Sequence, residues 1–130
     1  MADSPLAIST DRAPKSSSPI SQGIRIGQLV FVSGQVGVDP ESLKKVPGGI
    51  ESETEQALKN IGAVLEQTGG SMANVVKTTC FLADNGDFPR FNEAYAKFFG
   101  GPLPARSTVQ VGLTSGYLVE VEAIAYITNR

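Results

Sequence analysis

The stretch that decides the fold is Pro104-Ala105-Arg106-Ser107-Thr108-Val109, followed closely by Leu118-Val119-Glu120-Val121-Glu122. Proline can open a β-strand but is not found in its middle, so the first run begins a strand. Side chains alternate between the two faces of a strand, and Arg106, Thr108 and Gln110 therefore share one face. The run predicts a strand that carries a fixed cation near its start.

The second run places two carboxylates, Glu120 and Glu122, between valines. If the two runs pair as antiparallel neighbours in even register, directly opposed residues share a face, and Arg106 then lies on the same surface as both carboxylates. A slip of one residue would separate them. Arg106 is then either an ion-pair partner of a glutamate or a bidentate donor for the carboxylate of a ligand. Glu120 is correspondingly either that partner or a general base that orients a water molecule.

The segments before these runs alternate between strand-like and helix-like patterns. The apolar run at 29–33, bounded by glycines, is typical of a strand buried on both faces. Apolar residues then recur at helical spacing over 52–68, and Gly69-Gly70 ends the helix. In chain order we expect a strand at 29–33, a loop at 37–49, a helix at 52–68, a strand at 75–82, a helix at 87–99, and strands at 105–111 and 119–127.

This order predicts an α+β fold, in which two helices cover one face of a mixed sheet. Strand–helix–strand passages need a crossover, so part of the sheet should be parallel. The aromatic residues of the second helix fall on one stripe and are expected in the core. A large, half-apolar sheet face rarely stays exposed in a soluble monomer, so we expect self-association through the uncovered face. That face is expected to carry Arg106, Thr108, Gln110, Glu120, Ile124 and Tyr126.

The composition limits the possible functions. A chain of 130 residues makes one domain with a core of its own, and we expect a tail at 1–18, with a short strand near 6–9, before a domain at 19–130. The single cysteine, Cys80, is expected to be a buried thiol, and with no secretory signal it favours the cytoplasm. The absence of histidine excludes Ser-His and Cys-His nucleophiles and histidine-containing metal sites. No apolar run approaches the ~20 residues that span a bilayer.

Four groups of motifs, in order along 19–127, resemble the Rid family of reactive intermediate deaminases, also called the YjgF or L-PSP family. Pro-Ala-Arg-Ser followed by apolar-Glu-apolar-Glu-Ala-Ile-Ala is similar to its C-terminal signature. Three further matches are Val32-Ser33-Gly34-Gln35, the run Thr54-Glu55-Gln56-Ala57-Leu58-Lys59-Asn60-Ile61, and Val76-Lys77-Thr78-Thr79 with Asp87-Phe88 and Asn92-Glu93-Ala94-Tyr95.

The resemblance implies a chorismate-mutase-like fold, a homotrimer with sites at its subunit interfaces, and a reaction without cofactor or metal. That reaction is the hydrolysis of reactive 2-imino and enamine acids to 2-keto acids and ammonia, which limits damage to other enzymes. By the same resemblance, Arg106 binds the substrate carboxylate and Glu120 positions the water. Intersubunit clefts would therefore hold the active sites.

Further substrate-binding residues are also carried by the resemblance. They are the backbone at Ser33 and Gly34, the main chain at Thr108, and Asn92, for which a helix-surface or intersubunit hydrogen bond is an alternative. Many deaminating members have tyrosine in Gly-Pro-Tyr-Ser-Gln, whereas this chain reads Ser18-Pro19-Ile20-Ser21-Gln22. Ile20 thus lacks the aromatic wall and hydroxyl of those members, which leaves the substrate range open.

Two other functions remain to be compared with deamination. A trimer that binds small carboxylic acids or acts as a holdase would show ligand binding without ammonia release. An endoribonuclease would need a cationic surface, and the net charge of −2 with no basic strip argues against nucleic-acid binding. The expected partners are therefore a small 2-imino or 2-keto acid and further copies of this chain, with no membrane.

Overall fold

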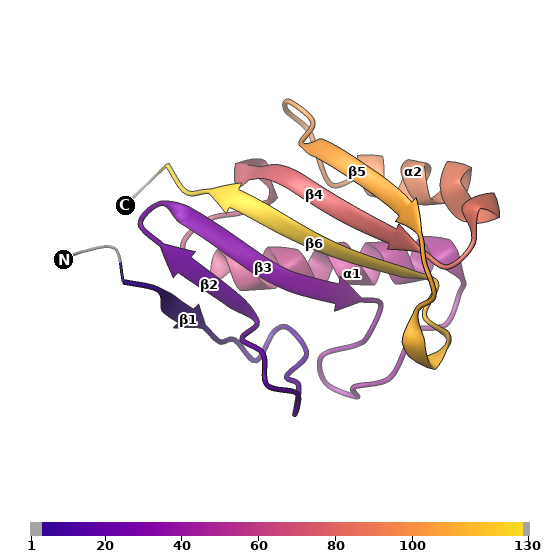
Figure 1. The fold of residues 1–130 in the computed structure, drawn as a ribbon, viewed down its shortest axis with the longest axis horizontal. Coiled ribbons are helices and arrows are strands. Elements are labelled where there is room, and N and C mark those ends of the chain that lie inside the picture. The colour runs from indigo at the N-terminus through magenta and orange to yellow at the C-terminus, as the bar shows by residue number, and fades with distance from the viewer. Residues whose placement is uncertain (1–3, 129–130) are drawn as a thin grey trace.

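The structure is a computed structural model that describes residues 4–128, and Figure 1 shows strands on one side and helices on the other. Strands form where β-branched and aromatic residues alternate with polar ones, and helices form where apolar residues recur every three to four positions. The strands are β1 (Leu6–Ile8), β2 (Gly23–Ile26), β3 (Leu29–Val36), β4 (Val75–Leu82), β5 (Ala105–Gln110) and β6 (Val119–Tyr126), and the α-helices are α1 (Ile50–Glu66) and α2 (Phe88–Ala96).

The six strands form one mixed sheet in the order β1-β2-β3-β6-β4-β5. The expected parallel pairing is confirmed between β4 and β5, whereas β6 lies antiparallel between β3 and β4. The expected antiparallel pairing of the last two strands is wrong, because β4 separates them. The α2 crossover carries the chain beyond β4 to the sheet edge, where β5 can only run parallel to β4.

This order corrects the predicted face of Arg106. In β6, Val121 and Ala123 face the helices, and their partners in β4 are Cys80 and Thr78. Paired residues share a face, and Thr78 is paired with Arg106 in β5. Arg106, Thr108 and Gln110 therefore point to the helix side, while Glu120, Glu122, Ile124 and Tyr126 point to the open side as expected.

The helices build the core against the sheet. The predicted aromatic stripe is confirmed in part, since Phe91 is fully buried and Tyr95 is only 5% exposed, whereas Phe88 is 39% exposed. Odd-numbered residues of β6 are buried under α1, as the alternation predicts. Within residues 4–128, no helix is both long and apolar enough to cross a membrane.

The opposite face of the sheet is uncovered in the single chain. Strand β3 alternates between buried and exposed residues, so the prediction that it is buried on both faces is wrong. Its Leu29 and Phe31 are 39% and 42% exposed, and Tyr126 of β6 and Val109 of the edge strand β5 are each 44% exposed. Figure 1 is viewed onto this face, with both helices behind the sheet. The apolar side chains leave a surface suited to a partner.

A β-bulge interrupts β3 where it passes β6. Val32 pairs with Ala123 and Gln35 pairs with Val121, so three steps along β3 match two steps along β6. The extra residue lies in Ser33-Gly34, the segment that the family resemblance places at the site. The bulge changes which residues of β3 face the helices, because Gln35 is buried there as Val32 is.

The segment between β1 and β2 is held by the side chain of Gln22. Its Oε1 accepts a hydrogen bond from the Thr10 amide at 2.7 Å, and its Nε2 lies 3.0–3.1 Å from the carbonyls of Thr10, Ala13 and Pro14. The expected short strand near 6–9 is confirmed as β1, which pairs with β2, a strand that the sequence reasoning missed. The division at residue 18 stays a prediction.

Candidate active site

Arg106 lies half-buried on the helix side of the edge strand β5. Its guanidinium carbon lies over the rings of Tyr95, Phe91 and Phe88, at 4.9, 5.5 and 5.6 Å from their centroids. A guanidinium stacks well on aromatic faces, because it is planar and weakly hydrated. Within residues 4–128, Arg106 has no carboxylate partner at ion-pair distance. The alternative of an ion pair with Glu120 or Glu122 is wrong for the single chain, because those carboxylates lie on the other face.

A hollow of about 280 Å³ opens beside this guanidinium. It lies between α2 and the start of β5, and Asn92, Tyr95, Pro104 and Arg106 contribute to its lining. An unpaired cation at the edge of such a hollow can bind a carboxylate through two parallel hydrogen bonds. Arg106 and Asn92, both predicted as site residues, are therefore brought together here.

Two buried polar atoms near Arg106 have no hydrogen-bond partner within the described chain. They are Oδ1 of Asn92 and Oγ1 of Thr108. Thr108 lies two residues beyond Arg106 on the same face of β5, where its neighbour in β4 is Cys80. Buried polar groups are rarely left unpaired in native proteins, so these two atoms mark a place where a ligand, water or second chain can bind.

Glu120 lies on the open face, where β6 passes the bulge of β3. A Cβ atom built on Gly34 would lie 2.0 Å from Oε2 and 2.9 Å from Cδ of Glu120. The carboxylate thus occupies the space that any larger residue at position 34 would take. Burial raises the pKa of the Glu120 carboxyl above its ordinary value, and the charge of Glu122 raises it further. The lowering by Arg106 that the sequence suggested has no part here, since the two residues lie on opposite faces.

Ser33 and Ile20 lie beside Gly34. The Ser33 hydroxyl donates a hydrogen bond to the carbonyl of Ser21 at 2.6 Å, and the Ser33 amide donates to the carbonyl of Gln22 at 3.0 Å. Ile20 is 60% exposed and contributes to the lining of three hollows, of which one is shared with Gly34 and another with Ser33. The bulge therefore brings Ile20, Ser33, Gly34 and Glu120 to one region of the open face.

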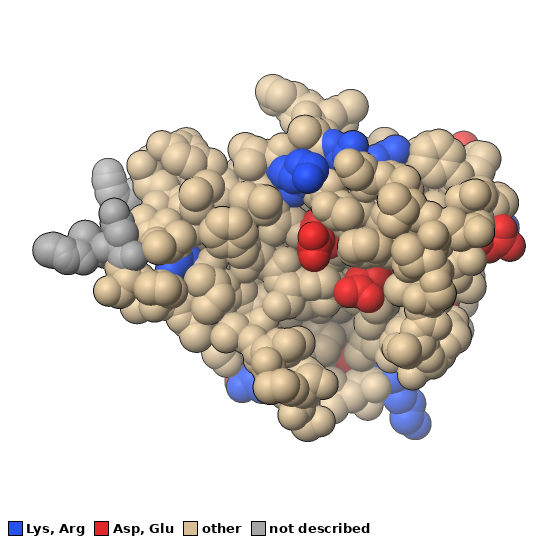
Figure 2. Space-filling view, viewed as in Figure 1, with Lys and Arg blue, Asp and Glu red and all other residues tan. Residues whose placement is uncertain are grey.

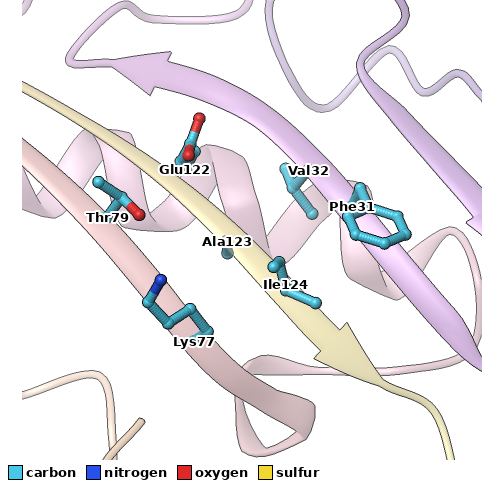
Figure 3. Close-up of a pocket in the computed structure, with 7 residues that line it drawn as sticks. All are labelled: Phe31, Val32, Lys77, Thr79, Glu122, Ala123 and Ile124. Atoms are coloured by element: carbon cyan, nitrogen blue, oxygen red, sulfur yellow. The ribbon is translucent and has the colours of Figure 1, made fainter. Parts of the chain in front are cut away.

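A smaller hollow of about 180 Å³ lies in the middle of the open face (Figure 3). Lys77 and Thr79 from β4, Phe31 from β3, and Glu122 and Ile124 from β6 contribute to its lining. Figure 2 shows a few acidic and basic side chains over the middle of this face, surrounded by uncharged surface. The sequence reasoning did not identify this hollow, because it needs β3, β6 and β4 as neighbours.

The candidate site residues therefore form two groups on opposite faces of the sheet. We call Arg106, Asn92 and Thr108 the arginine group, and Ile20, Ser33, Gly34 and Glu120 the glutamate group. One copy of the chain does not bring the two groups together. Sequence reasoning also missed the contact of Tyr95 with Arg106. The aromatic stripe was visible, but its relation to Arg106 depends on the parallel pairing of β4 and β5.

The described residues support neither a reactive cysteine nor a metal site. Cys80 is buried, and burial raises the pKa of its thiol to about 11, as expected of a structural cysteine. Within residues 4–128, no cluster of three or more acidic or cysteine side chains is arranged to hold a metal ion. The residues suited to chemistry are thus a cation, a carboxylate and backbone groups.

The fold is that of the family that the sequence resembles. The family model described as "Endoribonuclease L-PSP" matches residues 10–127. The chain therefore belongs to the L-PSP family, which is the Rid family of the sequence comparison.

Relatives and solved structures agree with this assignment. The 2-iminobutanoate/2-iminopropanoate deaminase of Mus musculus is 50% identical over 119 residues, which cover 91% of this chain and 88% of that protein. RidA from a Psychrobacter species has a TM-score of 0.90 at 41% identity, covering 94% of this chain and 99% of that one. Escherichia coli TdcF with bound serine has a TM-score of 0.90 at 35% identity, covering 95% and 99%.

Proposed function

We propose that this protein hydrolyses reactive 2-imino acids, and their enamine tautomers, to 2-keto acids and ammonia. The observation that carries the proposal is the guanidinium of Arg106, which is held on three aromatic rings, lacks a carboxylate partner and borders a hollow. The mouse relative, half of whose aligned residues are identical, is named for this deamination. The TdcF structure binds serine, which also has a carboxylate beside a nitrogen-bearing carbon.

In the proposed reaction, Arg106 donates two parallel hydrogen bonds to the substrate carboxylate. This contact fixes the adjacent C2 carbon and its C=N bond. The water oxygen bonds to C2, the π electrons of C=N move to nitrogen, and nitrogen takes up a proton. The hydroxyl of this carbinolamine then gives its proton to nitrogen, the C–N bond breaks, ammonia leaves with its electron pair, and a C=O bond forms. Imines already hydrolyse in water, so positioning supplies much of the rate.

Glu120 is the proposed base for this water. Its ionised form accepts a proton from the attacking water and returns one to the leaving nitrogen. Because burial raises its pKa, Glu120 is a better proton acceptor than an exposed carboxylate at the same pH. The backbone of the bulge at Ser33 and Gly34 lies next to this carboxylate and is suited to contact the imine.

The active site in this proposal lies between two copies of the chain. The arginine group of one copy, at the edge strand β5, meets the glutamate group on the open face of the next. Three copies arranged as a closed ring would repeat this site at each boundary, and would cover exposed Leu29, Phe31 and Tyr126. The homotrimer implied by the family resemblance supports this arrangement. Light scattering at low micromolar concentration should then report three chains.

The proposal is tested by ammonia release from freshly generated 2-iminobutanoate. Arg106→Ala should reduce kcat/KM by on the order of 100-fold or more, because alanine cannot bind the carboxylate. Arg106→Lys should restore little, because an ammonium lacks the planar, two-donor group. Arg12→Ala, which removes a surface ion pair with Glu66, is the matched control and should leave the rate within about twofold. A folded Arg106→Ala protein with unchanged turnover would refute the proposal.

The residue at position 20, Ile20, favours a second candidate function. In this alternative the protein is a trimer that binds small carboxylic acids but does not deaminate them. Ile20 is exposed beside Gly34 and has no hydroxyl to contact an imine. Full binding of 2-ketobutyrate by a protein that releases no ammonia would support this alternative. RNA cleavage is less well supported, because Glu120 and Glu122 both lie on the open face and the net charge is −2.

A further inference from the structure

The aromatic contact of Arg106 continues into a buried pair of hydroxyl groups. Tyr95, whose ring is the nearest of the three to the guanidinium, is only 5% exposed. Its hydroxyl lies 2.7 Å from Oγ1 of Thr78, which is 1% exposed. Thr78 in turn is the residue of β4 paired with Arg106. Strand β4, helix α2 and strand β5 therefore meet at one point.

The hydrogen bond between these two hydroxyl groups is not required for packing of the core. Two apolar residues of similar shape would fill the same space, and replacing both partners of a buried hydrogen bond is often nearly neutral for stability. The pair does, however, fix where the Tyr95 ring lies, because the hydroxyl is on the long axis of the ring and reaches Thr78 only when that axis points at Oγ1. Tyr95 also packs between the rings of Phe91 and Phe99, with centroids at 5.4 and 4.8 Å.

We propose that Thr78 and Tyr95 are positioning residues, which together hold the guanidinium of Arg106 at the angle that receives a substrate carboxylate. The inference rests on the proposed function, since it assigns a role relative to the substrate-binding arginine. Thr78 does not contact the substrate in this proposal, and Tyr95 acts through the guanidinium that it supports. Thr78 holds the Tyr95 ring in place, and the ring supports the guanidinium of Arg106, which has no carboxylate partner within the described chain.

The geometry explains why such support is needed. Arg106 projects from an edge strand and has no ion pair to restrain it within the described chain. An unrestrained arginine samples many rotamers, and a ligand must then meet the cost of ordering it. Stacking on fixed rings reduces that cost before the ligand arrives. Burial raises the pKa of the Tyr95 hydroxyl, so the group stays neutral beside the cation.

The test compares Thr78→Val, Tyr95→Phe and the double variant with the wild-type protein. Each single variant should raise KM for 2-iminobutanoate about 3- to 10-fold with kcat nearly unchanged, because substrate binding is weakened in the ground and transition states alike. The double variant should be no worse than either single one, since the two residues act as a unit. Thr78→Ser, which keeps the hydroxyl, should restore KM. Thr68→Val is the control, because it also removes a threonine hydrogen bond, to the carbonyl of Leu65, and should leave KM unchanged.

Two further measurements keep this inference separate from the deaminase proposal. Affinity for 2-ketobutyrate, measured by calorimetry, should fall by a similar factor in Thr78→Val even if no ammonia is released by any form. The side-chain Nε–H signal of Arg106, assigned by its loss in Arg106→Lys, should be sharp and shifted by the ring currents in the wild-type protein without ligand. It should broaden in Thr78→Val and recover in Thr78→Ser. A lower Tm in Thr78→Val with the Arg106 signal and ligand affinity unchanged would show a purely structural role and overturn the inference.

Discussion

The arginine group and the glutamate group are built in opposite ways. Arg106 is held by what surrounds it, since three rings from α2 lie against its guanidinium. The position of Glu120 depends instead on the lack of a side chain at Gly34, because the Glu120 carboxylate occupies the space that such a side chain would fill. The helix-covered face is complete within one chain, whereas the open face exposes apolar residues and a carboxylate of raised pKa. One half of the proposed site is therefore preorganised by the fold of a single chain, and the other half would be completed by the proposed assembly.

A large effect on the rate is expected from filling the space at Gly34. A Cβ at this position would overlap the end of a flexible side chain rather than backbone, so Gly34→Ala should fold normally but displace the Glu120 carboxylate. We expect a loss of deaminase rate on the order of 100-fold, because a catalytic group moved by about 1 Å loses its alignment. Steady-state ammonia release measures this change.

Gly112→Ala is the matched control for this substitution. A Cβ atom at Gly112 meets no atom within 4 Å, and the variant should retain full activity. A Gly34→Ala protein as active as the wild type would mean that Glu120 is not the water-positioning group. The glutamate group would then have no role in the reaction proposed for the arginine group.

A mixing experiment tests whether the two groups come from different copies. Arg106→Ala and Glu120→Gln should each be nearly inactive alone. In coexpressed, randomly mixed rings of three, each boundary has about a one-in-four chance of receiving an intact arginine group and an intact glutamate group. We therefore expect about a quarter of the wild-type activity per boundary. No recovery in rings shown by mass spectrometry to contain both variants would place both groups of a site in the same copy.

The smallest effect is expected on stability. The raised pKa of Glu120 means that the folded state binds its proton more tightly than the unfolded state does. Its contribution to stability is therefore present below the unfolded pKa and is lost as pH rises through the folded pKa. At pH 7 the ionised carboxylate lowers the stability of the folded state. Glu120→Gln should therefore raise Tm by roughly 1–3 °C while abolishing activity.

Calorimetry at two pH values checks this expectation. The gain in Tm should disappear near pH 3–4, where Glu120 is protonated in both states. Glu122→Gln should move the acid limb of the kcat/KM profile of the wild type to lower pH, because it removes a charge that raises the Glu120 pKa. A Glu120→Gln protein less stable than the wild type at pH 7 would contradict the view that burial destabilises the ionised carboxylate of Glu120.

The sequence predicted where the helices and strands lie better than it predicted which strands pair with each other. Alternation of Val119, Val121 and Ala123 with polar residues is a local pattern, and it correctly assigned the buried face of β6. The family motifs likewise needed only residue order. The partner of β5 is set instead by the path of the chain through α2, a non-local feature that no alternation contains. Because β5 pairs with β4 and not with β6, the prediction that Arg106 shares a face with Glu120 was wrong.

The bulge shows a second limit of the sequence. Ser33 and Gly34 were singled out by resemblance, but the extra residue is visible only when β3 and β6 are compared in register. The strand at Gly23–Ile26 was missed because it is only four residues long and includes an arginine. Short strands near a sheet edge gain their stability from pairing rather than from their own composition.

The bulge at Gly34 also bears on protein design. A designer who wanted only a stable six-stranded sheet would omit this residue, because deleting it would restore a regular ladder, with Ser33 opposite Glu122 and Gln35 still opposite Val121. The simplified protein would keep its core and lose the gap into which Glu120 extends. Automated idealisation of this backbone would therefore remove the proposed position of the Glu120 carboxylate without any sign in the packing, and position 34 should be held fixed in any stabilised or minimised version.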